Sequence, residues 1–73
     1  MNNVYVLKKD NILMGVFKSG ASAKKFLEDN DYLIVDTYIH TDSYIEYGVI
    51  EKSKMRGGAK VEYMSVMKWE VIE

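Results

Sequence analysis

The chain has no cysteine, no proline and only one histidine, His40. Without cysteine it can form neither a disulfide nor a thiolate metal site, and this composition fits a reducing compartment. Without proline, its turns have to be made by glycine, asparagine, aspartate and serine. A chain of 73 residues buries only roughly 60% of the surface that it exposes when unfolded. We therefore expect one domain over residues 1–73, stabilised by apolar packing and strand hydrogen bonds.

Long apolar runs are also absent. The N-terminal apolar stretch ends at Lys8 and lacks the basic segment and longer apolar core of a signal peptide. No stretch approaches the roughly 20 apolar residues of a membrane span. Apolar residues make up 48% of the chain and charged residues 29%, which is the balance of a folded globular protein. These features predict a cytoplasmic protein that does not contact membranes.

A hairpin is predicted at the start of the chain. Two stretches rich in apolar and β-branched residues, 4–9 and 12–18, flank Asp10 and Asn11. Aspartate and asparagine tolerate the positive φ angles of a tight hairpin turn. Both faces of these strands carry apolar side chains, so we expect the hairpin to be central in a sheet or packed against a partner.

A short helix is predicted over residues 19–30. Ser19 is a good N-cap, because its hydroxyl can accept a hydrogen bond from a free amide of the first turn. Ala23, Phe26 and Leu27 have the spacing of one apolar face. Asn30 suits the left-handed position at the end of the helix. Such a short helix has to lie against the sheet to be stable.

Three further strands are predicted in the rest of the chain, over residues 32–41, 44–52 and 59–72, with a loop over 54–58. Short connections favour antiparallel neighbours. The predicted fold class is therefore α+β, an antiparallel sheet of about five strands with one short helix, in the order ββαβββ.

The last strand alternates in polarity. Its apolar odd positions are predicted to face inward and its charged even positions outward. The predicted inward residues are Val61, Tyr63, Met67, Trp69 and Val71. Because the strand is long, we expect a bend or bulge at residues 64–66. A short helix over residues 64–69 is the alternative.

Three short segments carry a resemblance to known proteins. Val4–Leu7, Gly15–Ser19 and Ala23–Phe26 resemble the opening of a family of small bacterial and phage proteins of unknown function. The size and element order also look like those of small phage-encoded inhibitors of bacterial defence systems, including some anti-CRISPR proteins. The resemblance implies a phage-type binding protein that acts in the host cytoplasm.

No residue pattern points to catalysis. His40, with Asp36, Asp42 and Glu46 as neighbours in sequence, is the one candidate for a nucleophilic or metal site, and it provides too few strong ligands. Gly57 and Gly58 lack the lysine and following helix of a phosphate loop. We interpret His40 as a surface residue at a strand end. We expect no enzyme activity, no metal and no cofactor.

Acidic and basic residues are separated along the sequence. Residues 28–51 contain seven acidic residues and no lysine or arginine, whereas the whole chain has a net charge of −1. Tyrosines lie between these acids, and tyrosine is enriched at protein interfaces. The hypothesis is an acidic, tyrosine-rich hairpin that binds a basic protein partner. Its predicted contact residues are Asp36, Tyr38, Asp42, Tyr44, Glu46 and Tyr47.

Two purely structural interpretations stay open, as do nucleic-acid binding and self-association. The acids can be merely solvated and the tyrosines packed in the core. The basic segment 52–60, whose cations are Lys52, Lys54, Arg56 and Lys60, can be a surface turn or can contact nucleic acid with Tyr63 and Trp69 stacking on bases. A sequence pI near 5.8 argues against the nucleic-acid alternative. A homodimer, which is compatible with either binding role, also stays open, with the adaptable side chains Met14, Met55, Met64 and Met67 at its interface.

Overall fold

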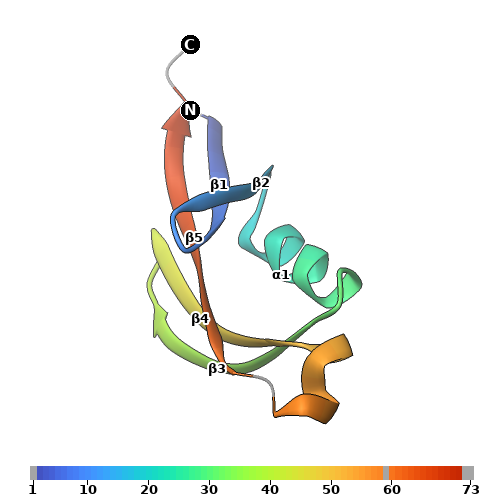
Figure 1. Cartoon of the computed structure of the whole chain (residues 1–73). Coiled ribbons are helices and arrows are strands. Elements are labelled where there is room, and N and C mark those ends of the chain that lie inside the picture. Colours follow the sequence, from blue (N-terminus) through green and yellow to red (C-terminus); the bar gives the residue numbers. More distant parts are fainter. Residues whose placement is uncertain (1, 59, 72–73) are drawn as a thin grey trace.

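The computed structural model describes residues 2–58 and 60–71, which form one antiparallel sheet, one α-helix and one 3₁₀ helix (Figure 1). The α+β fold and the order ββαβββ are confirmed. In chain order, the elements are β1 (Asn2–Lys9), β2 (Ile12–Phe17), α1 (Gly20–Asp29), β3 (Tyr32–His40), β4 (Tyr44–Glu51), the 3₁₀ helix η1 (Lys52–Gly57) and β5 (Glu62–Val71). None of the helices in the described residues is long and apolar enough to cross a membrane.

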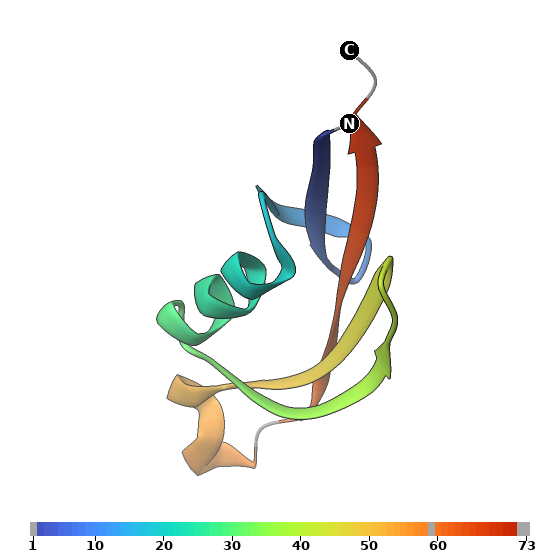
Figure 2. The same cartoon turned by 180° about the vertical axis from the view of Figure 1, so that it is seen from behind.

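The C-terminal strand lies in the middle of the sheet. The spatial order is β2-β1-β5-β4-β3, so β5 joins the N-terminal hairpin to the β3–β4 hairpin (Figures 1 and 2). β5 pairs with β1 along eight residues and with β4 along six, all antiparallel. This arrangement makes β1 central, as expected, but leaves β2 at an edge.

The predicted turn and helix start are confirmed. Asp10 and Asn11 have φ angles of 50° and 66°, the left-handed region that a tight hairpin turn requires. The Ser22 amide donates to Ser19 Oγ at 3.1 Å, so Ser19 caps the helix. The left-handed position falls one residue later than predicted, at Asp31 with φ 70°. Asn30 has φ −117°, and its side-chain amide instead donates to the Phe26 carbonyl at 2.7 Å.

The core lies between α1 and one face of the sheet, which we call the inner face; the opposite face is the outer face. Ala23 and Leu27 of α1 are fully buried and Phe26 packs beside them, so the predicted apolar face of the helix is confirmed. The fully buried sheet residues are Leu7, Val49 and Met64, with Val66 almost completely covered. Phe17 and Phe26 pack with their ring centroids 5.2 Å apart.

The predicted bulge and the alternative helix in the last strand are wrong. β5 is one strand through residues 64–69, without a register shift against β1 or β4. The register shifts occur elsewhere, where Met14 of β2 has no partner in β1 and where β3 pairs with β4. Ala59 and Ile72, within the predicted range of this strand, lie outside the described residues. The predicted loop at 54–58 is mostly the 3₁₀ helix η1, which ends at Gly57 and is followed by Gly58 with φ 74°.

The predicted inward side of β5 is also wrong. Met64 and Val66 face the core, while Tyr63, Met67 and Trp69 lie on the outer face and are exposed. A helix of 10 residues is only about 15 Å long, whereas a strand of 10 residues is about 33 Å long. α1 is therefore long enough to cover only the middle of β5. In that covered part, the two apolar residues Met64 and Val66 are enough to complete the core.

Candidate functional site

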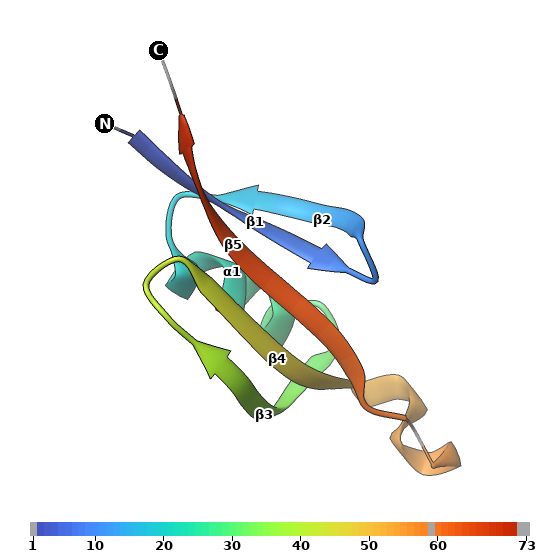
Figure 3. The same ribbon diagram turned by 90° about the vertical axis from the view of Figure 1, so that its left-hand side faces the viewer.

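The outer face of the sheet is not covered by any described element (Figure 3). In this view α1 lies behind the sheet, and β1, β5 and β4 run across the front. Cross-strand pairing brings one row of side chains together on this face: Val16, Val6, Met67 and Tyr44, from β2, β1, β5 and β4. The next row contains Lys8, Ser65, Glu46 and Ile39.

Aromatic residues are prominent on this face. Tyr63 is 55% exposed, Trp69 48% and Tyr38 46%. The Tyr38 and Tyr63 rings lie 5.5 Å apart between centroids, and Lys8 Nζ lies 5.6 Å from the centroid of the Trp69 ring. Clusters of exposed apolar side chains are typical of interaction sites. The outer face is therefore the strongest candidate for a functional surface among the described residues.

Gly48 explains how Tyr38 is held. A Cβ atom at Gly48 would lie only 2.8 Å from Cε2 and the hydroxyl of Tyr38. The Tyr38 ring therefore rests directly on the backbone of β4, beside Tyr63, the cross-strand neighbour of Gly48. Any larger residue at position 48 would displace the ring.

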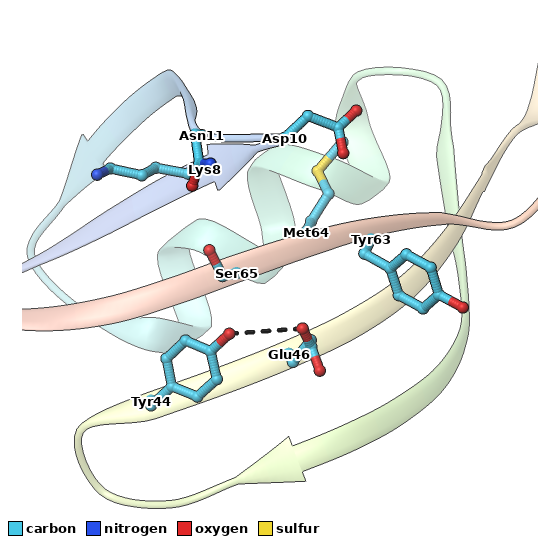
Figure 4. A pocket seen from close by; sticks show the side chains of 8 residues that line it. All are labelled: Lys8, Asp10, Asn11, Tyr44, Glu46, Tyr63, Met64 and Ser65. Carbon is cyan, nitrogen blue, oxygen red and sulfur yellow. Dashed lines mark hydrogen bonds between the residues drawn. The ribbon is translucent and has the colours of Figure 1, made fainter.

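A shallow depression lies between Lys8 and the acidic side of this face (Figure 4). Its volume is about 170 Å³, and its lining residues are Lys8, Asp10, Asn11, Tyr44, Glu46, Tyr63, Met64 and Ser65. The Tyr44 hydroxyl donates to Glu46 Oε1 at 3.5 Å. Partial burial, and then the negative charge of Glu46, raise the pKa of Tyr44. Tyr44 therefore stays a neutral hydrogen-bond donor beside the carboxylate.

Four of the six predicted contact residues share the outer face. Asp36 pairs with Gly48, Glu46 pairs with Ser65, and Tyr44 pairs with Met67. Tyr38 is the fourth. Burial raises its pKa, with smaller effects from Tyr63, Asp36 and Glu46. These residues form a surface that is aromatic and acidic on the β3–β4 side.

The other two residues lie elsewhere. Tyr47 is 6% exposed and belongs to the core, where burial, and then Glu28, raise its pKa. It pairs with Met64 on the inner face and is not available for a partner. Asp42 lies in the turn between β3 and β4, beside a groove of about 390 Å³ that is also lined by His40, Gly20 and Lys24. The alternative that tyrosines pack in the core is thus confirmed for Tyr47.

The basic segment is partly neutralised within the chain. Lys52 Nζ donates to the Glu28 carbonyl at 3.2 Å, and Lys54 Nζ lies 3.4 Å from Glu51 Oε2. Lys60 lines a hollow together with Glu51 and Glu62. Arg56 is exposed in η1. Of the four cations, Lys54 and Lys60 therefore lie beside carboxylates, while Lys52 donates to a backbone carbonyl.

Of the acidic neighbours of His40 in sequence, only Asp42 lines the same groove as His40. His40 pairs with Ile45, a residue that packs against the core, whereas Glu46 pairs with Ile39 on the outer face. In the part of the chain that the structure describes, no three His, Asp or Glu side chains are placed to hold a metal ion.

Sequence reasoning missed the outer-face role of Trp69, Tyr63, Met67 and Lys8. Lys8 lies in β1, whereas the other three lie in β5, whose sequence shows a clean alternation and whose apolar side was predicted to face the core. The signal that could have corrected this prediction is the pair Met64 and Val66, two apolar residues at the centre of the strand on the side that otherwise carries charged residues.

Comparison of the chain with protein-family models, curated proteins and solved structures found no match.

Proposed function

We propose that this chain is a non-enzymatic protein-binding module that binds a basic protein through the outer face of its sheet. The observation that carries the proposal is the uncovered surface on which Tyr38, Tyr63 and Trp69 are exposed beside Asp36 and Glu46. Tyrosine and tryptophan provide large contact areas at low entropic cost. Carboxylates at the edge of such a surface speed encounter with a basic partner and set its orientation.

Charges of opposite sign lie on opposite sides of this face. Lys8 lies over Trp69 on the β1 side, whereas Asp36 and Glu46 lie on the β3–β4 side. The basic segment of a partner would therefore lie over β4 and β3, with its apolar side chains towards Trp69 and Met67. This geometry favours a partner whose basic groove is bordered by apolar residues.

The resemblance to small phage proteins supports a narrower form of the proposal. In this form the partner is a nucleic-acid-binding or defence protein of the host, and the chain acts as an inhibitor in the host cytoplasm. A basic groove that normally holds a phosphate backbone offers the complementary charge for Asp36 and Glu46.

The test is capture of basic proteins from a bacterial lysate by immobilised chain, with identification by mass spectrometry. Wild-type chain should retain a basic protein that elutes with salt, and Asp36→Lys/Glu46→Lys should lose it. Glu28→Lys/Asp29→Lys is the matched control, because it makes the same charge change on exposed positions of α1. Trp69→Ala should also weaken retention. Equal retention of the same basic protein by the Asp36/Glu46 variant would contradict the proposal.

Contact of nucleic acid with Lys52, Lys54, Arg56 and Lys60 has weaker support, because carboxylates lie beside two of these cations, Lys54 and Lys60. Binding of single- and double-stranded DNA and RNA, measured at two salt concentrations, tests it. A nucleic-acid contact of this kind should weaken steeply as salt rises. Absence of binding at low salt removes this alternative.

A further inference from the structure

The two edges of the sheet differ in how well they are protected. β2 is an edge strand, and in Figure 3 no other element runs along its free edge, the one away from β1. Its six residues include no charged side chain, and Ile12, Leu13 and Val16 are 67%, 59% and 54% exposed. The other edge, β3, carries Asp36 and two register shifts against β4. Charges and irregularities are the usual protection against edge pairing, and β2 lacks the charges.

The arrangement of side chains along β2 is symmetric. Leu13 and Val16 pair with Lys8 and Val6 on the outer face. Ile12, Gly15 and Phe17 pair with residues of β1 on the inner face. The bulge at Met14 causes this, because the extra residue reverses the alternation at the middle of the strand. The sequence of faces is therefore the same in both directions about the Met14–Gly15 bond.

We infer that two copies of this chain associate through their β2 strands, paired antiparallel about a two-fold axis at Met14–Gly15. In this register Leu13 of one copy lies opposite Val16 of the other, and Ile12 lies opposite Phe17. Each pair joins two apolar side chains on the same face, as stable cross-strand pairs require. A bulge at an edge normally hinders pairing, but here it is what makes the two faces match.

The charges that flank β2 favour the same occupant. Lys18 follows one end of the strand, and Asp10 lies in the turn at the other end. Antiparallel pairing brings Lys18 of each copy close to the turn of the other copy. No like charges meet within the paired segment, since residues 12–17 are uncharged. A second copy thus satisfies both the apolar and the charge pattern of this edge.

The dimer would join the two sheets edge to edge and place both outer faces on one continuous surface. This inference does not depend on the proposed function, because self-association is measured without any partner. A chain that dimerises but captures no basic protein would contradict only the proposed function. A monomer that captures one would contradict only the dimer.

The first experiment measures molar mass by size-exclusion chromatography with light scattering over a range of concentrations. Wild-type chain should show a concentration-dependent dimer. Leu13→Lys/Val16→Lys places lysine opposite lysine across the axis and should weaken the dimer by about tenfold or more. Leu33→Lys/Val35→Lys is the matched control at the opposite edge, with the same residue types, and should dimerise normally. Circular dichroism confirms that each variant is folded.

The second experiment uses the absence of native cysteine. Under mild oxidation, Leu13→Cys/Val16→Cys should give a covalent dimer, because directly opposed residues have the Cα separation that a disulfide needs. Positions 13 and 16 of one strand are about 10 Å apart, so they cannot bridge within one copy. Leu13→Cys alone and Val16→Cys alone should cross-link much more slowly, since these positions face each other only as a pair.

Three results would overturn the inference. The first is a monomeric wild-type chain at all concentrations. The second is a dimer that Leu13→Lys/Val16→Lys leaves unchanged. The third is equal cross-linking of the single- and double-cysteine variants, which would show contact without this register.

Discussion

At the scale of single residues, Lys9 links three parts of the inner face. Its Nζ lies 2.9 Å from Glu62 Oε2, 3.6 Å from Glu51 Oε1 and 5.7 Å from the centroid of the Tyr32 ring. The side chain is only 22% exposed, and Glu62 Oε2 is buried. The contact with Glu62 raises the pKa of Lys9, although burial opposes this. The amine is therefore held as a cation between two carboxylates.

We expect Lys9→Met to lower the free energy of unfolding by about 1–3 kcal/mol, because a buried carboxylate oxygen of Glu62 loses its cation. The thioether side chain keeps the apolar packing, so the loss reports mainly the charge. Replacement of both partners by apolar residues is often close to neutral. Urea unfolding of Lys9→Met/Glu62→Leu should therefore recover most of the stability. A double variant no more stable than Lys9→Met would contradict this explanation.

Gly48→Ala tests the packing of Tyr38 on β4. The new methyl group would meet the Tyr38 ring, so we expect loss of the Tyr38–Tyr63 contact, visible as lost nuclear Overhauser effects between the rings. In a Tyr38→Ala background the obstacle is gone, and Gly48→Ala should then stabilise the strand by about 0.5–1 kcal/mol. A destabilising effect of the same size in both backgrounds would show that the Tyr38 ring is not the cause.

At the scale of elements, helix α1 depends on its N-cap. Ser19→Ala removes the acceptor for the Ser22 amide and should lower the free energy of unfolding by about 1 kcal/mol. Ser22→Ala is the matched control, because it keeps the bond from the Ser22 amide to Ser19 Oγ and removes only the exposed hydroxyl contact between the two serines, 2.9 Å between their Oγ atoms. It should be neutral or slightly stabilising, since alanine favours helix. Urea unfolding curves of the three proteins measure this, and equal losses in both variants would argue against the cap.

The elements were predicted far better than their faces. The Asp10–Asn11 turn and the Ser19 cap depend on residues close in sequence, so local pattern was sufficient. β5 shows the opposite case. Which of its two sides is buried depends on where a short helix lies across it. The buried side carries charged residues towards both ends of the strand, so the apolar pair Met64 and Val66 at its centre was overlooked.

At the scale of the whole molecule, several groups make stability depend on alkaline pH. The pKa values of Tyr38, Tyr44 and Tyr47 are raised above 10.0 and that of Lys9 above 10.5 in the folded chain. The folded state thus holds protons that the unfolded state releases. The resulting stability is complete below about pH 10 and falls as pH rises further.

We therefore expect the urea midpoint to be lower at about pH 11 than at about pH 8. Tyrosinate absorbance should rise later in folded chain than in chain unfolded in urea. Tyr44→Phe removes one of the contributing groups and should reduce the pH-dependent loss. A midpoint that does not change between the two pH values would contradict the assignment.

The candidate site was only partly accessible from the sequence. Asp36, Tyr38, Tyr44 and Glu46 were expected on one surface and do share the outer face. Tyr47 is a core residue, because successive residues of β4 face opposite sides of the sheet and position 47 faces α1. The contribution of Trp69 and Met67 from β5 required knowledge that β5 lies beside β4, which is a pairing of segments far apart in sequence.

The sequence by itself determined the class of fold, the order of the elements, the hairpin turn and the helix with its apolar face. These follow mainly from interactions between residues that are close along the chain. Only the tertiary structure decided that β5 lies at the centre of the sheet, that its odd residues face solvent and that β2 is a free edge. The reason is that these features depend on which distant strands pair and on how much of the sheet a 10-residue helix covers. The outer face, on which the proposed function rests, is therefore a product of the fold.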